Sequence, residues 1–299
     1  MKRVVSVSLG SSRGNKTFEV SILGNEFRIE RIGTDGDIQK FRRLFSELDG
    51  KVDALGIGGA DLYIVAGNKR YEFKQIRQLI SGAKTTPVVD GSGLKNTLER
   101  QTVVELQRTG RIDFSKERVL LVSAVDRFGM AQSLFESCPN VVCGDLMFAI
   151  GLPLRIRSYQ TVRILAWAVL PIVTRCPFQW FYPTGEKQDV RTPRCTWAFN
   201  EATVIAGDKH YIRKYAPDSL EGKTIITQSI RKDDIEWLRQ SKARRLITTT
   251  PEMGGETFAT NVIEGVLVAL LERKPEQLTP GDYLDALQQL GWRPNVFDL

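Results

Sequence analysis

The sequence has few of the residues from which metal and redox sites are built. It contains one histidine and four cysteines in 299 residues, and no two cysteines form a C-x-x-C pair. A zinc site needs closely spaced soft ligands, so we predict no bound metal. Cysteines without such spacing are typical of free thiols in a reducing compartment. We therefore expect a cytoplasmic protein.

Long hydrophobic runs are also missing. The apolar stretch at the N-terminus is too short for a signal peptide, and no small-residue cleavage site follows it. The most apolar later segment, 162–174, contains Arg163 and Pro171 and has about half of the residues that a bilayer-spanning helix needs. We predict a buried helix there, and a helix lying on a membrane surface is the alternative. We expect a soluble protein without a membrane partner.

Basic residues outnumber acidic ones, but no dense basic run occurs. Lys and Arg number 42 against 35 Asp and Glu, which gives a net charge of +7. Because the basic residues are spread along the chain, we favour a small anionic partner, a nucleotide or a carboxylate substrate, over nucleic acid. Arginines of the middle segment are candidates for binding carboxylate or phosphate. A homo-oligomer is compatible with the sequence.

The N-terminal part has the pattern of an α/β domain that starts β-β-β-α. Residues 3–9 form an apolar run, 17–33 alternate around Gly24-Asn25 as a hairpin does, and 35–48 carry an apolar stripe of helical spacing. We place this domain at 1–114, with an RNase H-like topology as one option. In an actin-like fold the loop Gly10-Ser11-Ser12 would contact phosphate, but Ser8 stands where such folds usually place a metal-binding acid.

The second part, 115–299, has the pattern of a Rossmann-like doubly wound parallel sheet. Residues 118–125 are almost continuously apolar, as in a strand covered on both faces. Further strands are predicted at 140–143, 203–206, 223–227 and 245–249. Helical segments separate them, so a nucleotide-binding α/β domain is indicated.

Ligands of such sheets bind beyond the carboxyl ends of the strands, so we look there for a site. Of the dinucleotide fingerprint G-x-G-x-x-G only the third glycine, Gly129, is present, and Ala124 would make the turn. Asp126 would repel a pyrophosphate, although Arg127 beside it offsets that charge. Asp145 follows Ala124 by 21 residues, where an acid that binds ribose is expected.

A later strand end would hold the nicotinamide ring. The small hydroxyl side chains and the proline of 248–251 would let the ring lie close to backbone. We therefore predict NAD or NADP as cofactor. The predicted cofactor-binding residues are Ala124, Asp126, Gly129, Asp145, Thr248, Thr249, Thr250 and Pro251.

The catalytic candidates are side chains that can move a proton. His210, the only histidine, follows Gly207-Asp208 at a predicted strand end, where an acid could hold it as an acid–base group. Lys187 lies in a proline-interrupted loop suited to a lid or a substrate clamp. Lys95 with Asp90 is a second candidate pair, at a strand end of the first domain.

Several strings resemble known dehydrogenases. Thr248–Pro251 resembles the strand-end N-A-T-P segment of shikimate and quinate dehydrogenases. The strings 125–131 (VDRFGMA), 144–148 (GDLMF) and 182–188 (YPTGEKQ) are similar to a bacterial family labelled quinate 5-dehydrogenase. The resemblance implies a Rossmann-like, NAD(P)-dependent oxidoreductase that acts on a small hydroxy or keto acid such as quinate or shikimate.

The catalytic motifs of those dehydrogenases are absent. Their Lys–Asp pair stands in N-V-T-x-P and N-T-D strings, and neither occurs here; Lys95-Asn96-Thr97 has the residue types in another order. An enzyme is therefore the leading hypothesis, and a nucleotide- or metabolite-binding protein without turnover is the alternative.

Overall fold

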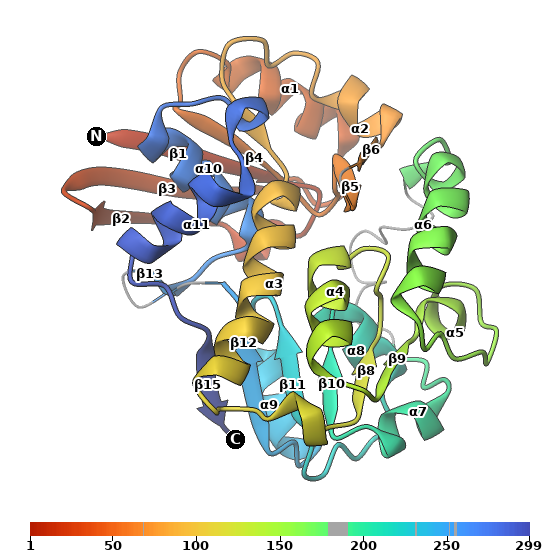
Figure 1. The fold of residues 1–299 in the computed structure, drawn as a ribbon. Coiled ribbons are helices and arrows are strands. Elements are labelled where there is room, and N and C mark those ends of the chain that lie inside the picture. The colour runs from red at the N-terminus through yellow and green to blue at the C-terminus, as the bar shows by residue number, and fades with distance from the viewer. Residues whose placement is uncertain (68, 179–190, 231, 251, 254–255) are drawn as a thin grey trace. The chain divides into compact units, whose positions relative to one another are not determined.

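The computed structural model describes residues 1–67, 69–178, 191–230, 232–250, 252–253 and 256–299. The chain forms two compact units (Figure 1), each assembled from three segments. Unit 1 comprises Met1–Thr97, Val169–Lys187 and Met253–Trp292, and unit 2 comprises Leu98–Ala168, Gln188–Glu252 and Arg293–Leu299. The predicted domains, 1–114 and 115–299, are each one continuous stretch of the chain. In the structure each unit is made of three separate stretches.

Unit 1 is built on a five-stranded sheet of order β2-β3-β1-β4-β7. Its strands are β1 (Lys2–Ser8), β2 (Lys16–Ile22), β3 (Asn25–Gly33), β4 (Ala54–Gly58) and β7 (Val88–Val89). The predicted β-β-β-α start is confirmed, with α1 at Ile38–Leu48. However, β1 pairs in parallel with β3, and β2 pairs only with β3. An RNase H-like sheet has its second strand between the first and third, so that option is wrong.

Local sequence explains the start of unit 1. The β2–β3 hairpin turns at Leu23 and Gly24, which both have positive φ (47° and 76°), as a type I′ turn requires. The turn lies one residue earlier than predicted. Helix α1 begins at Asp37, whose carboxylate accepts the Lys40 N–H at 2.9 Å.

The remaining elements of unit 1 include the helix that covers its sheet. They are η1 (Ser12–Gly14), β5 (Tyr63–Ala66), β6 (Lys69–Glu72), α2 (Lys74–Leu79), β14 (Glu256–Thr257), α10 (Thr260–Leu271), η5 (Pro275–Gln277) and α11 (Pro280–Gln289). Helix α10 packs on β1 and β4. Gly265 permits this approach, since a Cβ there would lie 2.9 Å from Val4 Cγ1.

Unit 2 confirms the predicted doubly wound sheet. Its strand order is β15-β12-β11-β10-β8-β9, and only β15 is antiparallel. The strands are β8 (Val119–Leu121), β9 (Val141–Cys143), β10 (Val204–Ala206), β11 (Thr224–Thr227), β12 (Arg245–Thr248) and β15 (Asn295–Asp298). β15 is not foreseen by the sequence analysis.

Helices and short elements complete unit 2. They are η2 (Phe114–Lys116), α4 (Phe128–Ser137), α5 (Asp145–Ala149), α7 (Thr196–Glu201), α8 (Lys209–Tyr215) and α9 (Lys232–Gln240). The short strand β13 (Glu252–Met253) stands where this segment of unit 2 ends and unit 1 resumes in the chain. Helices α3 (Ser92–Arg108) and α6 (Tyr159–Val173) run from one unit into the other. Buried apolar residues of the strands, among them Leu120, Ile205 and Leu246, form the core.

The order of the strands defines a switch point in unit 2. From β8 the chain goes to β9 on one side, and then to β10 on the other side of β8. In open α/β sheets, ligands bind outside the carboxyl ends of the two strands where the order reverses. The expected site of unit 2 therefore lies beyond β8 and β10.

Helix α6 coincides with the most apolar segment of the sequence. Val162, Ala166 and Leu170 are buried, as predicted, but Ile164 and Trp167 are exposed. The prediction of a buried helix is thus correct for one face only. Within the described part of the chain, no helix is both long and apolar enough to cross a membrane.

Candidate functional site

The carboxyl ends of four neighbouring strands lie at one edge of the unit 2 sheet. Leu121 of β8 is level with Ala206 of β10, which is level with Ile226 of β11, and Ile226 is level with Ile247 of β12. The loops that follow these strands therefore start side by side. This matches the placement that the sequence analysis predicts for a site.

A buried arginine links the connections after β8 and β10 directly, and the connection after β11 through Glu99. The Arg127 side chain is 1 % exposed, and its guanidinium forms an ion pair with Glu99 of α3. Its Nη2 donates to Asp208 Oδ2 at 2.9 Å, and its Nε lies 4.0 Å from Asp126 Oδ2. Gln228, after β11, donates to Glu99 Oε1 at 3.0 Å. We call these five residues the Arg127 cluster.

The charges of the Arg127 cluster differ in their access to solvent. Burying a charge is costly unless an opposite charge is paired with it, and Glu99, with a side chain 1 % exposed, is paired with Arg127. The Asp126 and Asp208 side chains keep 32 % and 27 % of their surface exposed. The solvent side of the cluster therefore consists of two carboxylates, which accept hydrogen bonds from hydroxyl and amino groups.

The start of helix α8 fixes Asp208. Its Oδ1 accepts the backbone N–H groups of His210 at 2.8 Å and Tyr211 at 3.3 Å, while Oδ2 accepts from Arg127. Asp is a favoured residue at a helix N-cap, because its carboxylate satisfies amides that have no partner within the helix. The carboxylate is thus held from two sides, and its orientation does not depend on a ligand.

Asp145 binds the loop after β8. Its carboxylate accepts the N–H groups of Ala124 at 3.0 Å and Val125 at 2.9 Å. Burial raises the pKa of Asp145 to about 6, although these amides act in the opposite direction. The amides of Ala124 and Val125 therefore already have an acceptor, and the loop does not offer them to a phosphate. The predicted contact of Asp145 with ribose stays a prediction.

Helix α4 starts beside the cluster without a side-chain cap from the described residues. Gly129 lies in its buried first turn, where the third fingerprint glycine is expected. In the same connection the buried Ser123 hydroxyl has no hydrogen-bond partner among the described residues. The first amides of a helix attract anionic groups, but the carboxylates of Asp126 and Asp208 beside this end of α4 oppose that attraction.

The threonines at the end of β12 and directly after it are buried. Thr248, Thr249 and Thr250 are fully buried. The Thr249 N–H donates to the Thr227 carbonyl at 2.9 Å, and the Thr250 hydroxyl donates to the Gln228 carbonyl at 2.8 Å. These residues hold the β11 connection in place. Pro251 lies outside the described residues, and the predicted contact with nicotinamide stays a prediction.

The predicted catalytic residues fall in different units. His210 is partly exposed, in the first turn of α8 next to Asp208. Asp90 and Lys95 belong to unit 1, where the Asp90 carboxylate accepts the N–H groups of Leu62 and Tyr63, both at 2.7 Å. Asp90 therefore holds a loop together. Lys187 lies outside the described residues.

Comparison with known proteins identifies the family. A family model described as a domain of unknown function (DUF8754) matches residues 93–299, and a second (DUF8753) matches residues 3–90. The chain belongs to the DUF8754 family. All five residues of the Arg127 cluster lie in the region that the DUF8754 model matches. No curated protein matches the chain.

Solved structures share only the general arrangement of the chain. An NAD-dependent malic enzyme from Thermotoga maritima is 12 % identical, with a TM-score of 0.36 over 97 % of this chain and 84 % of that one. A hetero-hexameric glutamate dehydrogenase from Thermus thermophilus is 14 % identical, with a TM-score of 0.42 over 97 % and 73 %. A sugar transport substrate-binding protein from Bordetella parapertussis is 10 % identical, with a TM-score of 0.38 over 100 % and 89 %. Similarities of this size do not indicate a shared ligand or activity.

Sequence reasoning missed Glu99 and its contact with Gln228, a residue that follows a predicted strand. Glu99 stands 28 residues before Arg127 in the interior of α3, where an acid usually faces solvent. The one available signal is its place between the buried residues Leu98 and Thr102. Gln228 is 129 residues from Glu99, so no local pattern links the two.

The phosphate loop considered for unit 1 is bonded internally. The Gly10 N–H donates to Ser8 Oγ at 3.1 Å, and the Ser12 N–H donates to Asp35 Oδ1 at 2.7 Å. Arg31 donates to Ser8 Oγ at 3.2 Å. These amides already have acceptors, so the loop is not arranged to bind a phosphate.

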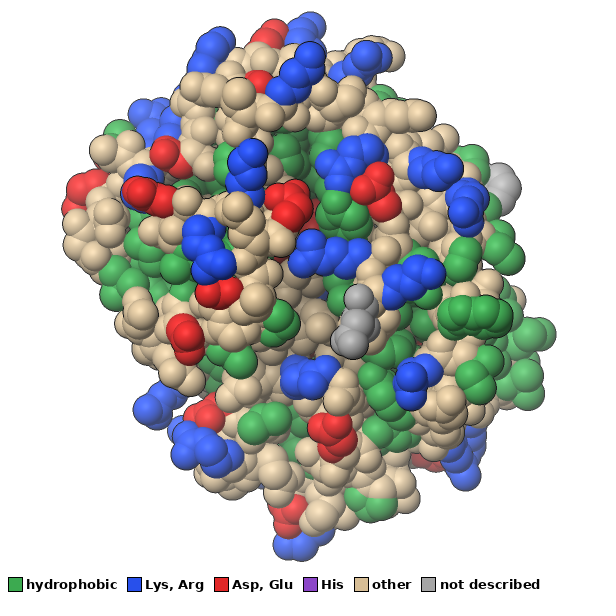
Figure 2. Space-filling view, turned by 45° about the horizontal axis from the view of Figure 1, so that its top comes forward, with side chains coloured by type: hydrophobic (Ala, Val, Ile, Leu, Met, Phe, Trp, Pro, Cys, Tyr) green, Lys and Arg blue, Asp and Glu red, His purple; other side chains and the backbone are tan. Residues whose placement is uncertain are grey.

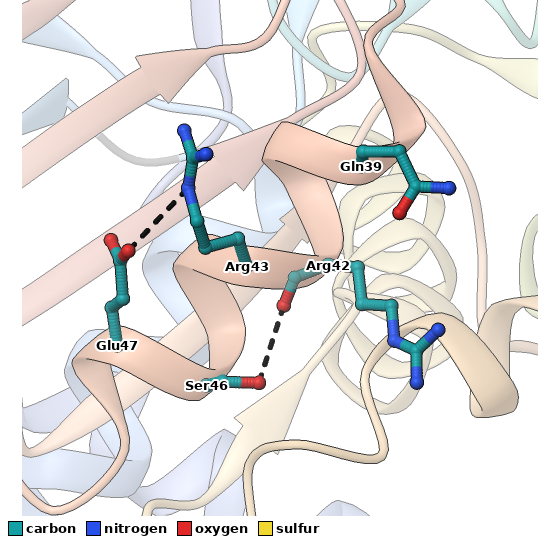
Figure 3. Close-up of a pocket in the computed structure, with 5 residues that line it drawn as sticks. All are labelled: Gln39, Arg42, Arg43, Ser46 and Glu47. Carbon is teal, nitrogen blue, oxygen red and sulfur yellow. Dashed lines mark hydrogen bonds and ion pairs between the residues drawn. The ribbon is translucent and has the colours of Figure 1, made fainter.

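Other surfaces offer weaker sites. Figure 3 shows a hollow on α1 lined by Gln39, Arg42, Arg43, Ser46 and Glu47. All five residues come from one helix, and two of them form an exposed i,i+4 ion pair. Figure 2 shows Lys and Arg scattered among acidic side chains on the face it presents, without a continuous basic patch. Among the described residues, no group of three or more His, Cys, Asp or Glu could hold a metal ion.

Proposed function

We propose that unit 2 binds a small hydroxylated molecule at the switch point between β8 and β10. The observation that supports this most is the Arg127 cluster. Its two outer carboxylates, Asp126 and Asp208, would accept hydrogen bonds from hydroxyl groups of the ligand. A hydroxy acid and the ribose of a nucleotide both carry such hydroxyl groups.

The arrangement is prepared before a ligand arrives. Asp208 is held by Arg127 and by two amides of α8, so little conformational freedom would be lost on binding. Each hydrogen bond from a ligand hydroxyl to a charged acceptor contributes about 1.5–3 kcal/mol. Two such bonds would give a small ligand a large part of its affinity.

A second candidate is an NAD(P)-dependent oxidoreductase that acts on a small hydroxy or keto acid, with quinate and shikimate as the compounds to try first. It is favoured by the place of His210, in the first turn of α8 directly after Asp208, from which its imidazole could take the hydroxyl proton. The internal use of the Ala124 and Val125 amides by Asp145 weighs against a pyrophosphate bound in the usual way. We therefore put the binding of a small molecule before the oxidoreductase, because binding does not require the cofactor.

Calorimetric titration tests the binding proposal. The panel contains quinate, shikimate, AMP, NAD and NADP, and at least one of them should bind. Asp208→Asn should weaken that binding by about 1–3 kcal/mol, because the charge of the acceptor is lost. Asn is as good an N-cap as Asp, so α8 should keep its start.

The control for the titration is Asp218→Asn, at a side chain 94 % exposed on the surface of unit 2. Equal affinity of the Asp208 variant, the control and the unchanged chain would overturn the binding proposal, as would the absence of heat with every compound. If NAD or NADP binds and is reduced with a hydroxy acid, His210→Gln should lower turnover about 10²–10⁴-fold at unchanged cofactor affinity. Binding of an acid alone, without reduction of either cofactor, would remove the oxidoreductase candidate.

A further inference from the structure

Unit 2 carries an exposed apolar surface that the ligand site does not use. It consists of apolar residues from the segment after α5 and from α6 as far as Trp167. Its five large apolar residues are Ile150 (63 % exposed), Leu152 (47 %), Leu154 (54 %), Ile164 (57 %) and Trp167 (71 %). We call them the α5–α6 surface. Figure 2 shows apolar side chains gathered along its right-hand margin, where α5 and α6 lie.

Helix α6 is apolar on more sides than a surface helix needs. Val162, Ala166 and Leu170 already pack it against the protein, and Ile164 and Trp167 point away from that packed face. A helix that is apolar nearly all round is usually buried. Single exposed apolar side chains are common, but a group of large ones marks a surface that contacts a partner or a membrane.

The charged residues of the stretch of sequence that carries this surface have one sign. No Asp or Glu occurs between Asp145 and Glu186, and that stretch contains four arginines. Arg155 is paired with Glu201 at 2.7 Å. Arg157 and Arg163 are exposed and form no ion pair with any described residue. The partner that complements the α5–α6 surface is therefore apolar and anionic.

We propose that the α5–α6 surface rests on the face of an anionic lipid bilayer. Its apolar side chains would enter the boundary between headgroups and acyl chains, and Arg157 and Arg163 would lie against lipid phosphates. Helices that lie in a bilayer surface have this combination of Trp, Ile or Leu with flanking basic residues. Such a contact needs no segment that spans the bilayer. A helix lying on a membrane surface is the alternative that the sequence leaves open for 162–174.

The same charges disfavour a second copy of the chain as the occupant. In a two-fold symmetric dimer the same surface faces itself. Arg157 and Arg163 of one copy would then face a surface that carries the same arginines, and the stretch has no acid to pair with them. A bilayer that contains anionic lipid supplies the missing negative charge over the whole surface.

The test is flotation of the full chain with lipid vesicles. The chain should float with vesicles of phosphatidylcholine containing phosphatidylglycerol and stay behind with phosphatidylcholine alone. Ile164→Ser with Trp167→Ser should lower the bound fraction at least about tenfold, as should Arg157→Glu with Arg163→Glu. Raised salt should weaken the binding of the unchanged chain.

Matched controls separate the surface from general effects. Val104→Ser replaces an apolar residue on α3 that is 42 % exposed, and Arg239→Glu reverses an exposed charge on α9; both should float as the unchanged chain does. Absence of flotation with anionic vesicles, or equal flotation of all variants, would overturn the proposal. So would a dimer in sedimentation that Ile164→Ser with Trp167→Ser converts to a monomer, because a second copy would then cover the surface.

Discussion

Arg127 shows how a single residue organises the candidate site. Its guanidinium is almost completely buried, and such a charge is tolerated only where opposite charges and hydrogen bonds satisfy it. Two of its partners stand 28 residues before it and 81 residues after it. The sequence predicts that Asp126 and Asp208 lie at strand ends, because each follows an apolar run. It does not predict that a buried arginine holds them, because that contact depends on the packing of α3 and β10.

Glu264 is the residue whose titration should be visible in stability. It is buried on α10 and accepts the Gly91 N–H at 2.7 Å and the Tyr283 O–H at 2.8 Å. Burial, and to a lesser extent the charge of Asp90, raise the pKa of Glu264 from 4.5 to about 7. A raised pKa means that the folded state holds the proton more tightly. The contribution of this group to stability is therefore complete below pH 4.5 and is lost as the pH rises through about 7.

Glu264→Gln should remove this pH dependence. The unchanged chain should lose on the order of 3 kcal/mol of unfolding free energy from this group as the pH rises from 4.5 to above 7. Glutamine keeps one oxygen, which can accept the Gly91 N–H in the place of Oε2, and its amide NH2 can donate to the Tyr283 hydroxyl oxygen in the place of Oε1. It resembles the protonated acid and has no proton to lose. Urea unfolding at pH 5 and pH 8 measures the difference. Asp145 titrates in the same direction in both proteins, so an equal pH dependence in the variant would show that Glu264 is not the cause.

At the scale of elements, local sequence patterns predict the helices and strands that nearby residues determine. The hairpin of β2 and β3, helix α1 and the strands of unit 2 follow from alternation, apolar stripes and turn residues. The predicted strand 118–125 is shorter in the structure, because only 119–121 has strands on both sides. Strand β15 was missed because it has four residues and exists by pairing with β12, about 50 residues earlier in the chain.

The cap of α1 gives a test at this scale. The Asp37 carboxylate accepts the Lys40 N–H at 2.9 Å and satisfies one of the amides that the helix leaves unpaired. Asp37→Ala should therefore lower the unfolding free energy by about 1 kcal/mol, measured by urea unfolding. Asp37→Asn is the control and should cost less, since Asn caps as well as Asp. A loss with Asn as large as that with Ala would mean that the charge of Asp37, and not its cap, stabilises the chain.

At the scale of the whole molecule, the division of the chain escapes a sequence-based prediction. The sequence pattern changes near residue 114, where apolar runs typical of a parallel sheet begin, and this suggests two continuous domains. In the structure, α10 packs on β1 and β4, so a segment from the last fifth of the chain completes the first sheet. A purely local pattern does not indicate which sheet an apolar helix covers. The Rossmann-like order of the second sheet, in contrast, follows from the alternation of its strands and helices.

The central claim is that small ligands bind at the switch point of unit 2. Hydrogen–deuterium exchange of the full chain tests it most directly, with and without the compound of the calorimetric panel that binds most tightly. Bound ligand should slow exchange in the peptides that cover 122–130 and 207–212, which contain the connections after β8 and β10. Asp208→Asn should reduce that protection at the same ligand concentration. Protection confined to peptides of unit 1, with none at 122–130 or 207–212, would contradict the account.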